Sequence, residues 1–343
     1  MTDTPLRIAV VGCGSMGRRR IRHAIELGGA DVMGWDIRAD RRAEVEGLFP
    51  MATADSEAGM WGWGPDALFI SVPPAEHEHY IFGAIERGIP FMVEQPITHR
   101  LDNLGAIRAG VAGARAGAGL VCHVSSNQRF SPRVHALEKA LTETDVGKPL
   151  TGLVEIGEWL PDWHPYEPYQ DYYPSWKRMG GGLDAICDLD WLRHLFGEVG
   201  RAVSLTSRKS DLEIDTDDVV QLILDFVDGP QIMVHCDMLQ RPFRRQSRIV
   251  CMNGTIVHEH PNQSLQVYVV DRDETVEIPF QVDLARYPHM QGKPQHTFAE
   301  PMYEADSAVF LRRLVAGDTS LDSLDTGLAN LRLVLPLIFG DGS

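Results

Sequence analysis

Short apolar runs alternate with amphipathic helical stretches over the first 125 residues, and this alternation constrains the fold more than any other feature of the chain. Parallel strands need a helical crossover between them, so the pattern is typical of a parallel α/β sheet. We expect strands at 8–11, 32–36, 67–72, 91–94 and 120–125, with helices at 16–27, 76–87 and 101–116. This order predicts two mononucleotide-binding halves in series.

The pattern changes after residue 127, where strands follow one another with few helices between them, as in an antiparallel sheet. We expect helices at 133–142 and 183–195 and closing helices at 302–315 and 324–338; strands are expected at 202–208, 219–227, 231–238, 248–251, 255–258 and 265–270. The sequence therefore predicts an α/β chain of two domains. Residues 1–126 form a Rossmann dinucleotide-binding domain, and residues 127–343 form an α+β domain with an open, mostly antiparallel sheet.

A glycine-rich loop lies between the first expected strand and helix, and it reads Gly12, Cys13, Gly14, Ser15, Met16, Gly17. In such a loop the first glycine permits a tight turn, the second lets a pyrophosphate approach, and the third packs helix on strand. An acidic residue, Asp36, ends the next strand, where a carboxylate accepts hydrogen bonds from the ribose hydroxyls. NAD is therefore favoured as cofactor. NADP stays possible because Arg38, Arg41 and Arg42 follow.

The charge balance limits the partners of the chain. Its 32 basic and 48 acidic residues give a formal net charge of −16, which disfavours nucleic acid and membrane surfaces. We expect a cytoplasmic protein that binds a small molecule, since there is no long apolar run or signal pattern and the five cysteines form no Cys-x-x-Cys pair. No metal is predicted, because Cys187, Asp190 and His194 have helical spacing but lack a fourth ligand.

Four motifs make the whole chain resemble the Gfo/Idh/MocA oxidoreductase family. They are the glycine loop, Ser71-Val72-Pro73-Pro74, Glu94-Gln95-Pro96 and Asn127-Gln128-Arg129-Phe130. Residues 161–166, 180–182 and 239–241 further resemble a subgroup associated with sialic-acid-like and nucleotide-sugar metabolism. The resemblance implies an NAD(P)-dependent reaction at a CH–OH carbon of a sugar-like substrate. It also implies a homodimer or homotetramer formed through the second sheet.

The glycine loop, Asp36 and the resemblance together give a set of expected cofactor contacts. These are Gly12, Cys13, Gly14, Ser15, Met16, Gly17, Asp36, Ile37, Arg38, Ser71, Val72, Pro73, His77, Glu94, Gln95 and Gln128.

Both proton-handling residues of the family are replaced in this chain. Gln95 stands where the family has the lysine of Glu-Lys-Pro, and Cys187 aligns with the family histidine. An amide forms hydrogen bonds but relays no proton near neutral pH. We therefore expect Gln95 to orient the substrate. A residue among Asp184, Cys187, Asp188 and His164 would handle the proton, with Cys187 needing a lowered pKa.

The same residues also allow structural interpretations. The helix at 183–195 fits a solvated polar side on which Asp190 pairs with His194. The aromatic segment 161–176 fits either a sugar site or a hydrophobic wall, and Arg241 with Arg244, Arg245 and Arg248 fits either an anion site or a solvated strand. The expected substrate contacts are Arg129, Trp163, Tyr166, Lys177 and Arg241.

Three functions remain open from the sequence. The first is an NAD-dependent dehydrogenase for a sugar-like or carboxylated polyol. The second is a catalytically silent dinucleotide-binding accessory or sensor protein. The third is an NAD-retaining lyase, epimerase or glycosidase without net redox change.

Overall fold

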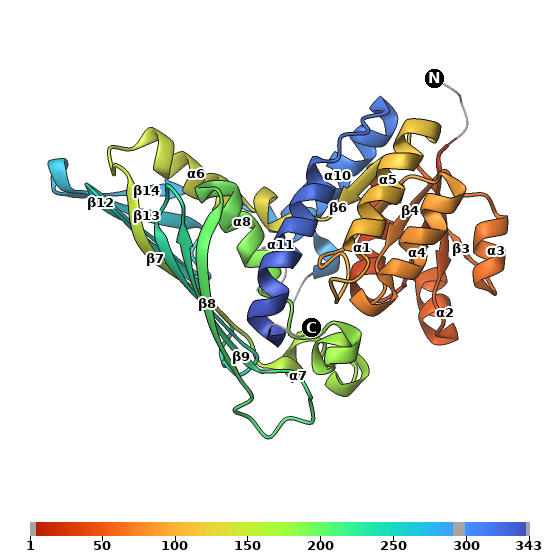
Figure 1. Ribbon diagram of the computed structural model, residues 1–343, viewed down its shortest axis with the longest axis horizontal. Coiled ribbons are helices and arrows are strands. Elements are labelled where there is room, and N and C mark those ends of the chain that lie inside the picture. The colour runs from red at the N-terminus through yellow and green to blue at the C-terminus, as the bar shows by residue number, and fades with distance from the viewer. Residues whose placement is uncertain (1–4, 291–298, 341–343) are drawn as a thin grey trace. The chain divides into compact units, whose positions relative to one another are not determined.

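The computed structural model describes residues 5–290 and 299–340. The chain forms two compact units (Figure 1). The first unit runs through Ser126 and adds Arg178–Gly180 and Tyr303–Arg332. The second unit begins at Asn127, and the late segment 303–332 belongs to the first unit.

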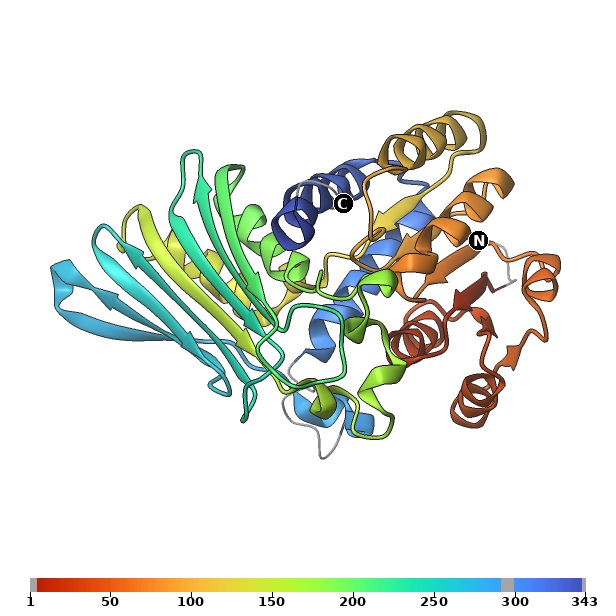
Figure 2. The ribbon, with the colours of Figure 1, turned by 60° about the horizontal axis from the view of Figure 1, so that its bottom comes forward.

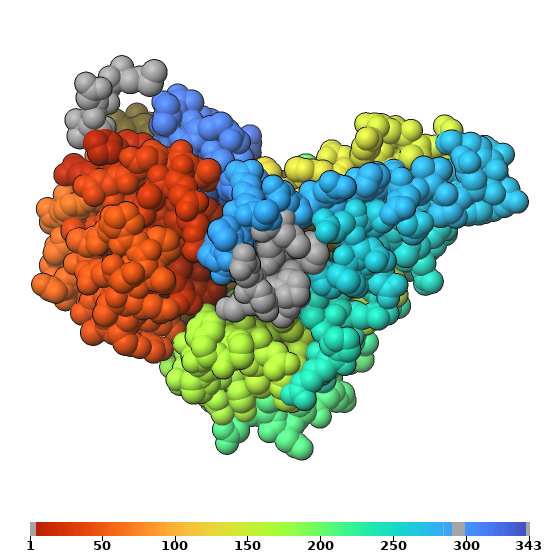
Figure 3. All heavy atoms as spheres, turned by 180° about the vertical axis from the view of Figure 1, so that it is seen from behind, coloured from red at the N-terminus to blue at the C-terminus, as the bar shows by residue number. Residues whose placement is uncertain are grey.

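The first unit is a parallel sheet of six strands in the order β3-β2-β1-β4-β5-β6, which confirms the predicted Rossmann topology. Its strands are β1 (Arg7–Val11), β2 (Asp31–Trp35), β3 (Ala52–Thr53), β4 (Ala67–Ile70), β5 (Phe91–Val93) and β6 (Cys122–Val124). Its helices are α1 (Ser15–Glu26), α2 (Ala39–Leu48), α3 (Glu57–Gly62), α4 (Pro74–Arg87) and α5 (Leu104–Ala118). Figure 3 shows the early residues, in red and orange, as one contiguous body.

The helix α10 (Glu300–Ala316) supplies part of the first unit's core from the far end of the chain. Phe310 is fully buried, and its ring lies 5.3 Å from that of Phe69 on β4 in an edge-on arrangement. A buried aromatic pair contributes more than its area alone. An apolar helical pattern predicts burial but not the surface that is covered, so the sequence placed this helix in the second domain.

The second unit is an eight-stranded sheet in the order β14-β13-β12-β11-β7-β10-β9-β8. Only β7 and β10 pair in parallel, so the sheet is mostly antiparallel, as predicted. Its strands are β7 (Pro149–Gly157), β8 (Val199–Ser207), β9 (Val219–Phe226), β10 (Gln231–Asp237), β11 (Arg244–Cys251), β12 (Gly254–Glu259), β13 (Ser264–Val269) and β14 (Glu274–Pro279). The edge strand β14 was not predicted, because its charged residues hide the alternation that marks a strand.

One face of this sheet is packed and the other is open (Figure 2). On β9, Val220, Leu222 and Leu224 are buried, whereas Gln221 and Ile223 between them are exposed. The helices α6 (Pro132–Glu143) and α8 (Ile186–Phe196) belong to this unit. The predicted loop 161–176 overlaps the one-turn helix α7 (Leu160–Trp163) and contains two 3-10 turns.

Candidate functional site

The glycine loop connects β1 to α1 in a backbone shape that only glycine permits. Gly12 has φ of +87°, and a Cβ there would lie 2.6 Å from the carbonyl oxygen of Ser71. A Cβ at Gly17 would lie 1.8 Å from the carbonyl oxygen of Gly12. The loop therefore brings α1 directly onto the end of β1, as the spacing of the glycines predicted.

The N-terminus of α1 is suited to an anion. Gly14 caps the helix without a side-chain hydrogen bond, and the described first turn contains no acidic residue. The side chain beside it is basic, because Nη1 of Arg41 would lie 3.0 Å from a Cβ at Gly14. Backbone N–H groups at a helix start attract phosphate groups. The residues present therefore fit the pyrophosphate of a dinucleotide.

Asp36 lies directly after β2 and is tied to the loop. Its Oδ2 accepts a hydrogen bond from the N–H of Cys13 at 2.8 Å, and its Oδ1 accepts one from the N–H of Arg38 at 2.8 Å. The arginine side chains nearby are engaged: Arg38 pairs with Asp40 at 2.6 Å, and Arg42 donates to the carbonyl oxygen of Asp36 at 2.6 Å. A carboxylate held in this way disfavours a 2′-phosphate, which fits NAD better than NADP.

Two side chains at the carboxyl ends of neighbouring strands have buried polar atoms without partners. After β4, Oγ of Ser71 is buried; after β5, so are Oε1 and Nε2 of Gln95, and none has a hydrogen bond within the described residues. Buried polar groups are nearly always hydrogen-bonded, so unpaired ones mark the place of a ligand. Ligands of open α/β sheets bind at this end of the strands. Ser71 and Gln95 therefore remain candidates to contact cofactor and substrate.

His77 differs from the expected cofactor contact. Its Nδ1 lies 2.9 Å from the carbonyl oxygen of Pro96 and its Nε2 lies 2.8 Å from that of Val72. Both ring nitrogens therefore lie against backbone carbonyl oxygens of the two loops that follow β4 and β5, and the ring, whose pKa burial lowers, donates to one of them. We correct the expectation accordingly: His77 positions these loops and has no ring nitrogen left for a ligand.

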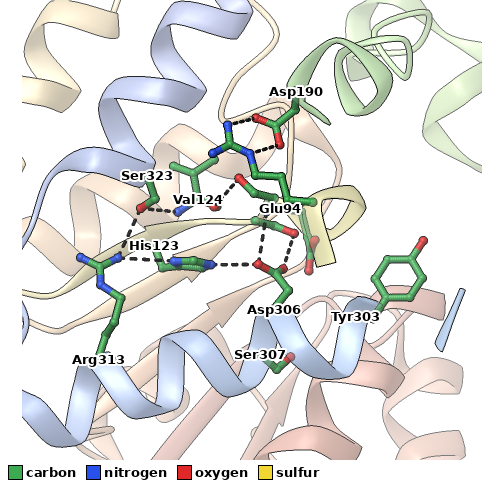
Figure 4. Close-up of polar contacts among 12 residues, drawn as sticks. Glu94, His123, Val124, Asp190, Tyr303, Asp306, Ser307, Arg313 and Ser323 are labelled. Carbon is green, nitrogen blue, oxygen red and sulfur yellow. Dashed lines mark hydrogen bonds and ion pairs between the residues drawn. The ribbon is translucent and has the colours of Figure 1, made fainter. Parts of the chain in front are cut away.

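Glu94 is held by an arginine that the sequence analysis missed. Arg20 on α1 is fully buried, and its Nε and Nη2 donate to the carboxylate of Glu94 at 2.6 and 2.9 Å. Arg20 also pairs with the buried Asp306 of α10 at 3.2 Å. Asp306 in turn accepts a hydrogen bond from the hydroxyl of Ser125. It also faces Nε2 of His123 at 2.9 Å (Figure 4). The network fixes Glu94 and hence the start of the segment that carries Gln95.

Asp184 of the second unit precedes α8 and has an unusual environment. Its Oδ1 accepts a hydrogen bond from the hydroxyl of Tyr173 at 2.6 Å, whereas its Oδ2 is buried with no partner within the described residues. Burial raises the pKa of Asp184 above the ordinary value, against the opposing effect of Tyr173. One carboxylate oxygen of Asp184 is thus buried without a hydrogen-bond partner in the described chain, on a carboxyl whose pKa is raised. Tyr173 was noted only as one of several loop aromatics in the sequence.

The surroundings of Cys187 and Asp188 do not suit these residues to handle the proton. Burial, reinforced by Asp184 and Asp188, raises the pKa of Cys187 well above its ordinary range, so the expected weak acid is wrong. The Oδ1 atom of Asp188 accepts from Nε1 of Trp191 at 2.7 Å and pairs with Arg245 at 3.2 Å. Asp188 and Asp190 on the polar side of α8 are therefore buried, whereas His194 near the end of the helix is exposed.

Arg129 is engaged by the helix α8. Its Nε and Nη2 donate to the two carboxylate oxygens of Asp190, both at 2.7 Å, and Asp190 is buried. The suggested pair of Asp190 with His194 stays a prediction, since Asp190 influences the pKa of His194. Arg129 therefore anchors α8 to the turn at 127–130, where Gln128 is also buried, and its expected contact with the substrate stays a prediction.

The aromatic segment brings together several expected substrate contacts. Nδ1 of His164 lies 3.2 Å from the hydroxyl of Tyr166, and its ring centroid lies 5.0 Å from that of Tyr172. Trp163 donates to the carbonyl oxygen of Glu158 at 3.2 Å. Lys177 is exposed, with Nζ 5.9 Å from the ring centroid of Phe339.

The four arginines around β11 do not form one basic cluster. Arg241 stacks on Trp159 at 4.0 Å and pairs with Asp162 at 3.6 Å. Arg244 and Arg248 are exposed, whereas Arg245 lies on the packed face with Asp188. Because side chains alternate along a strand, neighbours in sequence face opposite sides.

The described residues contain no group of three or more His, Cys, Asp or Glu side chains placed to hold a metal ion. None of their helices combines the length and the apolar character that a membrane span requires. All five cysteines are free.

Two family models match the chain. "Oxidoreductase family, NAD-binding Rossmann fold" matches residues 6–117, and "GFO/IDH/MocA C-terminal domain" matches residues 134–257. Inositol 2-dehydrogenase 4 of Saccharopolyspora erythraea is 32% identical over 44% of this chain and 45% of its own length. D-apiose dehydrogenase of Paraburkholderia graminis is 26% identical over 69% of this chain and 61% of its own. The matched regions thus span about half of these curated relatives.

A solved structure shares the whole fold. The oxidoreductase from Agrobacterium radiobacter, determined in complex with NAD+, L-tartaric acid and magnesium, superposes with a TM-score of 0.78. The match covers 96% of this chain and 95% of that one, at 19% sequence identity. At this identity the likeness establishes the fold alone.

Proposed function

Because the chain belongs to the Gfo/Idh/MocA family of oxidoreductases, we propose that it oxidises a CH–OH carbon of a sugar-like or polyol substrate with NAD. Its first unit has the family's NAD-binding Rossmann fold. The two curated relatives described above are dehydrogenases, one of a polyol and one of a sugar. The unpaired polar atoms of Ser71 and Gln95 and the helix start at Gly14 support the same cofactor.

The observation that carries this proposal is the carboxyl of Asp184. Oxidation of a carbinol requires that the hydroxyl lose a proton while carbon loses a hydride, for which NAD would supply the acceptor when bound. Oδ2 of Asp184 takes the hydroxyl proton, since it is buried and unpartnered while Oδ1 is held by Tyr173 at 2.6 Å. The raised pKa brings this carboxyl closer to the basicity that the transfer needs.

Gln95 takes a different role from a lysine at the same position. Its amide oxygen and nitrogen can accept from and donate to a substrate hydroxyl, and both are buried without partners in the described chain. The amide therefore orients the carbinol and leaves the proton to Asp184. Removing a cation from the site also removes stabilisation of an alkoxide, so this enzyme depends more heavily on its base.

The rest of the proposed substrate site comes from the aromatic segment. Trp163, Tyr166 and His164 offer ring faces and polar tips, the combination that suits sugar rings. Tyr166 is 53% exposed, so its ring is accessible. Lys177 and Arg241 add two cations that would favour a substrate with a carboxylate.

The experiment is NADH formation at 340 nm with NAD+ and a panel of inositols, aldoses and aldonic acids. A saturable rate with one class supports the proposal, and a preference for NAD+ over NADP+ supports the role of Asp36. Tightly co-purifying NAD that is never reduced on balance would replace the proposal with an NAD-retaining lyase, epimerase or glycosidase. Binding of NAD without any turnover would indicate the accessory function.

We further infer that the chain self-associates through the open face of the second sheet. The cross-strand neighbours Val203, Ile223 and Met233 are 54%, 39% and 48% exposed and form an apolar row. Light scattering after size exclusion tests this: Met233→Lys should lower the molar mass. Val315→Lys, at an equally apolar exposed position of the first unit, should leave it unchanged. A cytoplasmic location stays a proposal, supported by the five free cysteines.

A further inference from the structure

Arg133 is a buried arginine without an acceptor. It occupies the first turn of α6, is 5% exposed, and forms no hydrogen bond or ion pair with the described residues. Its Nη2 atom is fully enclosed and unsatisfied. Guanidinium groups carry five N–H donors, and a buried arginine is normally surrounded by oxygen atoms.

A tryptophan ring supplies part of the stabilisation of the buried Arg133 side chain. The guanidinium carbon of Arg133 lies 4.7 Å from the ring centroid of Trp191, which is fully buried on α8. Stacking of this kind stabilises the cation through the face of the ring. The N–H donors lie in the plane of the guanidinium and point away from that face, so the stack satisfies none of them.

The surrounding charges do not neutralise Arg133. Arg245 adds a second cation whose field lowers the pKa of Arg133, and Asp188 supplies the opposing carboxylate. Asp188 is already paired with Arg245 at 3.2 Å and accepts from Trp191 at 2.7 Å. Glu158 lies near enough to Arg245 for that arginine to lower its pKa, but it has no corresponding effect on Arg133. One positive charge therefore remains uncompensated.

Two more buried polar atoms lie on the packed face of the sheet, the face that also carries Arg245. Ser247 on β11 and His258 on β12 are cross-strand partners, 2% and 4% exposed, and Ser247 lies two residues from Arg245 on the packed face. Oγ of Ser247 and Nδ1 of His258 have no partners within the described residues. Burial, followed by Arg133, lowers the pKa of His258 to about 3, so the ring is neutral.

Deprotonation of Arg133 does not remove its positive charge at neutral pH. Burial lowers the pKa of Arg133 to about 9, so the side chain is still protonated at neutral pH. A buried charge without a counter-charge is strongly unfavourable. A small anion that accepts from the guanidinium and from the Ser247 hydroxyl would satisfy both donors at once.

We propose that Arg133 and Ser247 bind one monovalent anion, a halide ion or a small carboxylate, on the packed face of the second sheet. The monovalent charge matches the single uncompensated cation. His258 borders the site, with a neutral ring that adds no further charge. The proposed anion site uses neither Asp184 nor Gln95, so the proposal does not depend on the proposed oxidation.

The test is thermal unfolding of the full chain at constant ionic strength, with sodium sulfate replaced stepwise by sodium bromide or sodium acetate. The wild type should gain about 3 °C in Tm, and the gain should saturate. Arg133→Met keeps an apolar stem against Trp191 and should abolish the gain. Arg248→Met removes an exposed arginine from the opposite face of β11 and should retain it.

A second readout covers the case in which Arg133→Met does not fold. Anomalous diffraction from wild-type crystals grown in bromide should show a peak at Nη2 of Arg133, and Ser247→Ala should weaken the bromide gain. Retention of the full bromide or acetate gain in Arg133→Met would overturn the proposal. A water molecule in place of the anomalous bromide peak would also overturn the proposal. So would a wild-type Tm that neither bromide nor acetate changes.

Discussion

Two buried arginines, one in each unit, differ in what surrounds them. Arg20 donates to Glu94, Ser125, Asp306, Ser307 and the carbonyl oxygen of Tyr303. Arg133 has the face of Trp191 and no acceptor. Arg20 is 0% exposed and Arg133 is 5% exposed, so the two differ mainly in whether the protein supplies acceptors in place of water.

This difference separates groups that hold the fold from groups that are left for a ligand. Every N–H donor of the Arg20 guanidinium has an acceptor, and these hydrogen bonds join α1, α10 and the segment that follows β5. Arg133, Oδ2 of Asp184 and the amide of Gln95 are buried and unsatisfied within the described residues. We expect removal of the first kind to cost stability, and removal of the second kind to cost binding or turnover.

The largest stability effect should come from Arg20→Met. It leaves the carboxylates of Glu94 and Asp306 without their cation, which should lower the free energy of unfolding by about 3–5 kcal/mol. Urea unfolding followed by circular dichroism measures this. Arg108→Met removes an exposed pair with Asp325 and should change stability by at most about 1 kcal/mol. Equal losses in both variants would contradict the special status of Arg20.

Acid should weaken the same network through Asp306. His123 and Arg20 hold the pKa of Asp306 at about 2 against the effect of burial. A depressed pKa stabilises the fold above the unfolded value near 4, and this stability is lost as pH falls toward 2; it amounts to about 2–3 kcal/mol. The stability gap between wild type and Asp306→Asn should therefore narrow between pH 5 and 3. A gap that stays constant would show that the charge of Asp306 is unimportant.

The smallest expected change in the free energy of unfolding is a gain, not a loss. In sulfate buffer without halide or carboxylate, Arg133→Met removes an uncompensated charge and keeps the contact with Trp191. It should leave the free energy of unfolding unchanged or raise it by about 1 kcal/mol. Differential scanning calorimetry resolves this difference. A loss as large as that of Arg20→Met would mean that Arg133 has acceptors in the folded protein.

The sequence predicted the parts of the site that follow from local backbone rules. The glycine loop and Asp36 occur where strand, turn and helix follow one another, so spacing alone located them. The role of Arg20 depends on Asp306, 286 residues away, and no local pattern reports that contact. A buried basic residue three positions after Gly17, on the inner side of α1, was the available signal.

The chemistry of the expected proton-handling residues was harder to predict, for a similar reason. Alignment with the family identified Asp184 and Cys187, but burial decides their chemistry, and burial was not readable from the spacing of α8. The partner of Asp184 is Tyr173, 11 residues earlier in an aromatic segment where several tyrosines were equally suited. The polar side of α8 looked solvated because the pairing of Asp190 with Arg129 spans 61 residues.

The most direct measurement is the kcat of Asp184→Asn for NAD+ reduction with the best substrate of the panel. Asparagine keeps the size of the side chain but cannot take the hydroxyl proton. The account predicts a fall in kcat of at least about 100-fold, with the dissociation constant of NAD within twofold of the wild-type value. A kcat within a few-fold of wild type would contradict the assignment of Asp184 as the proton acceptor.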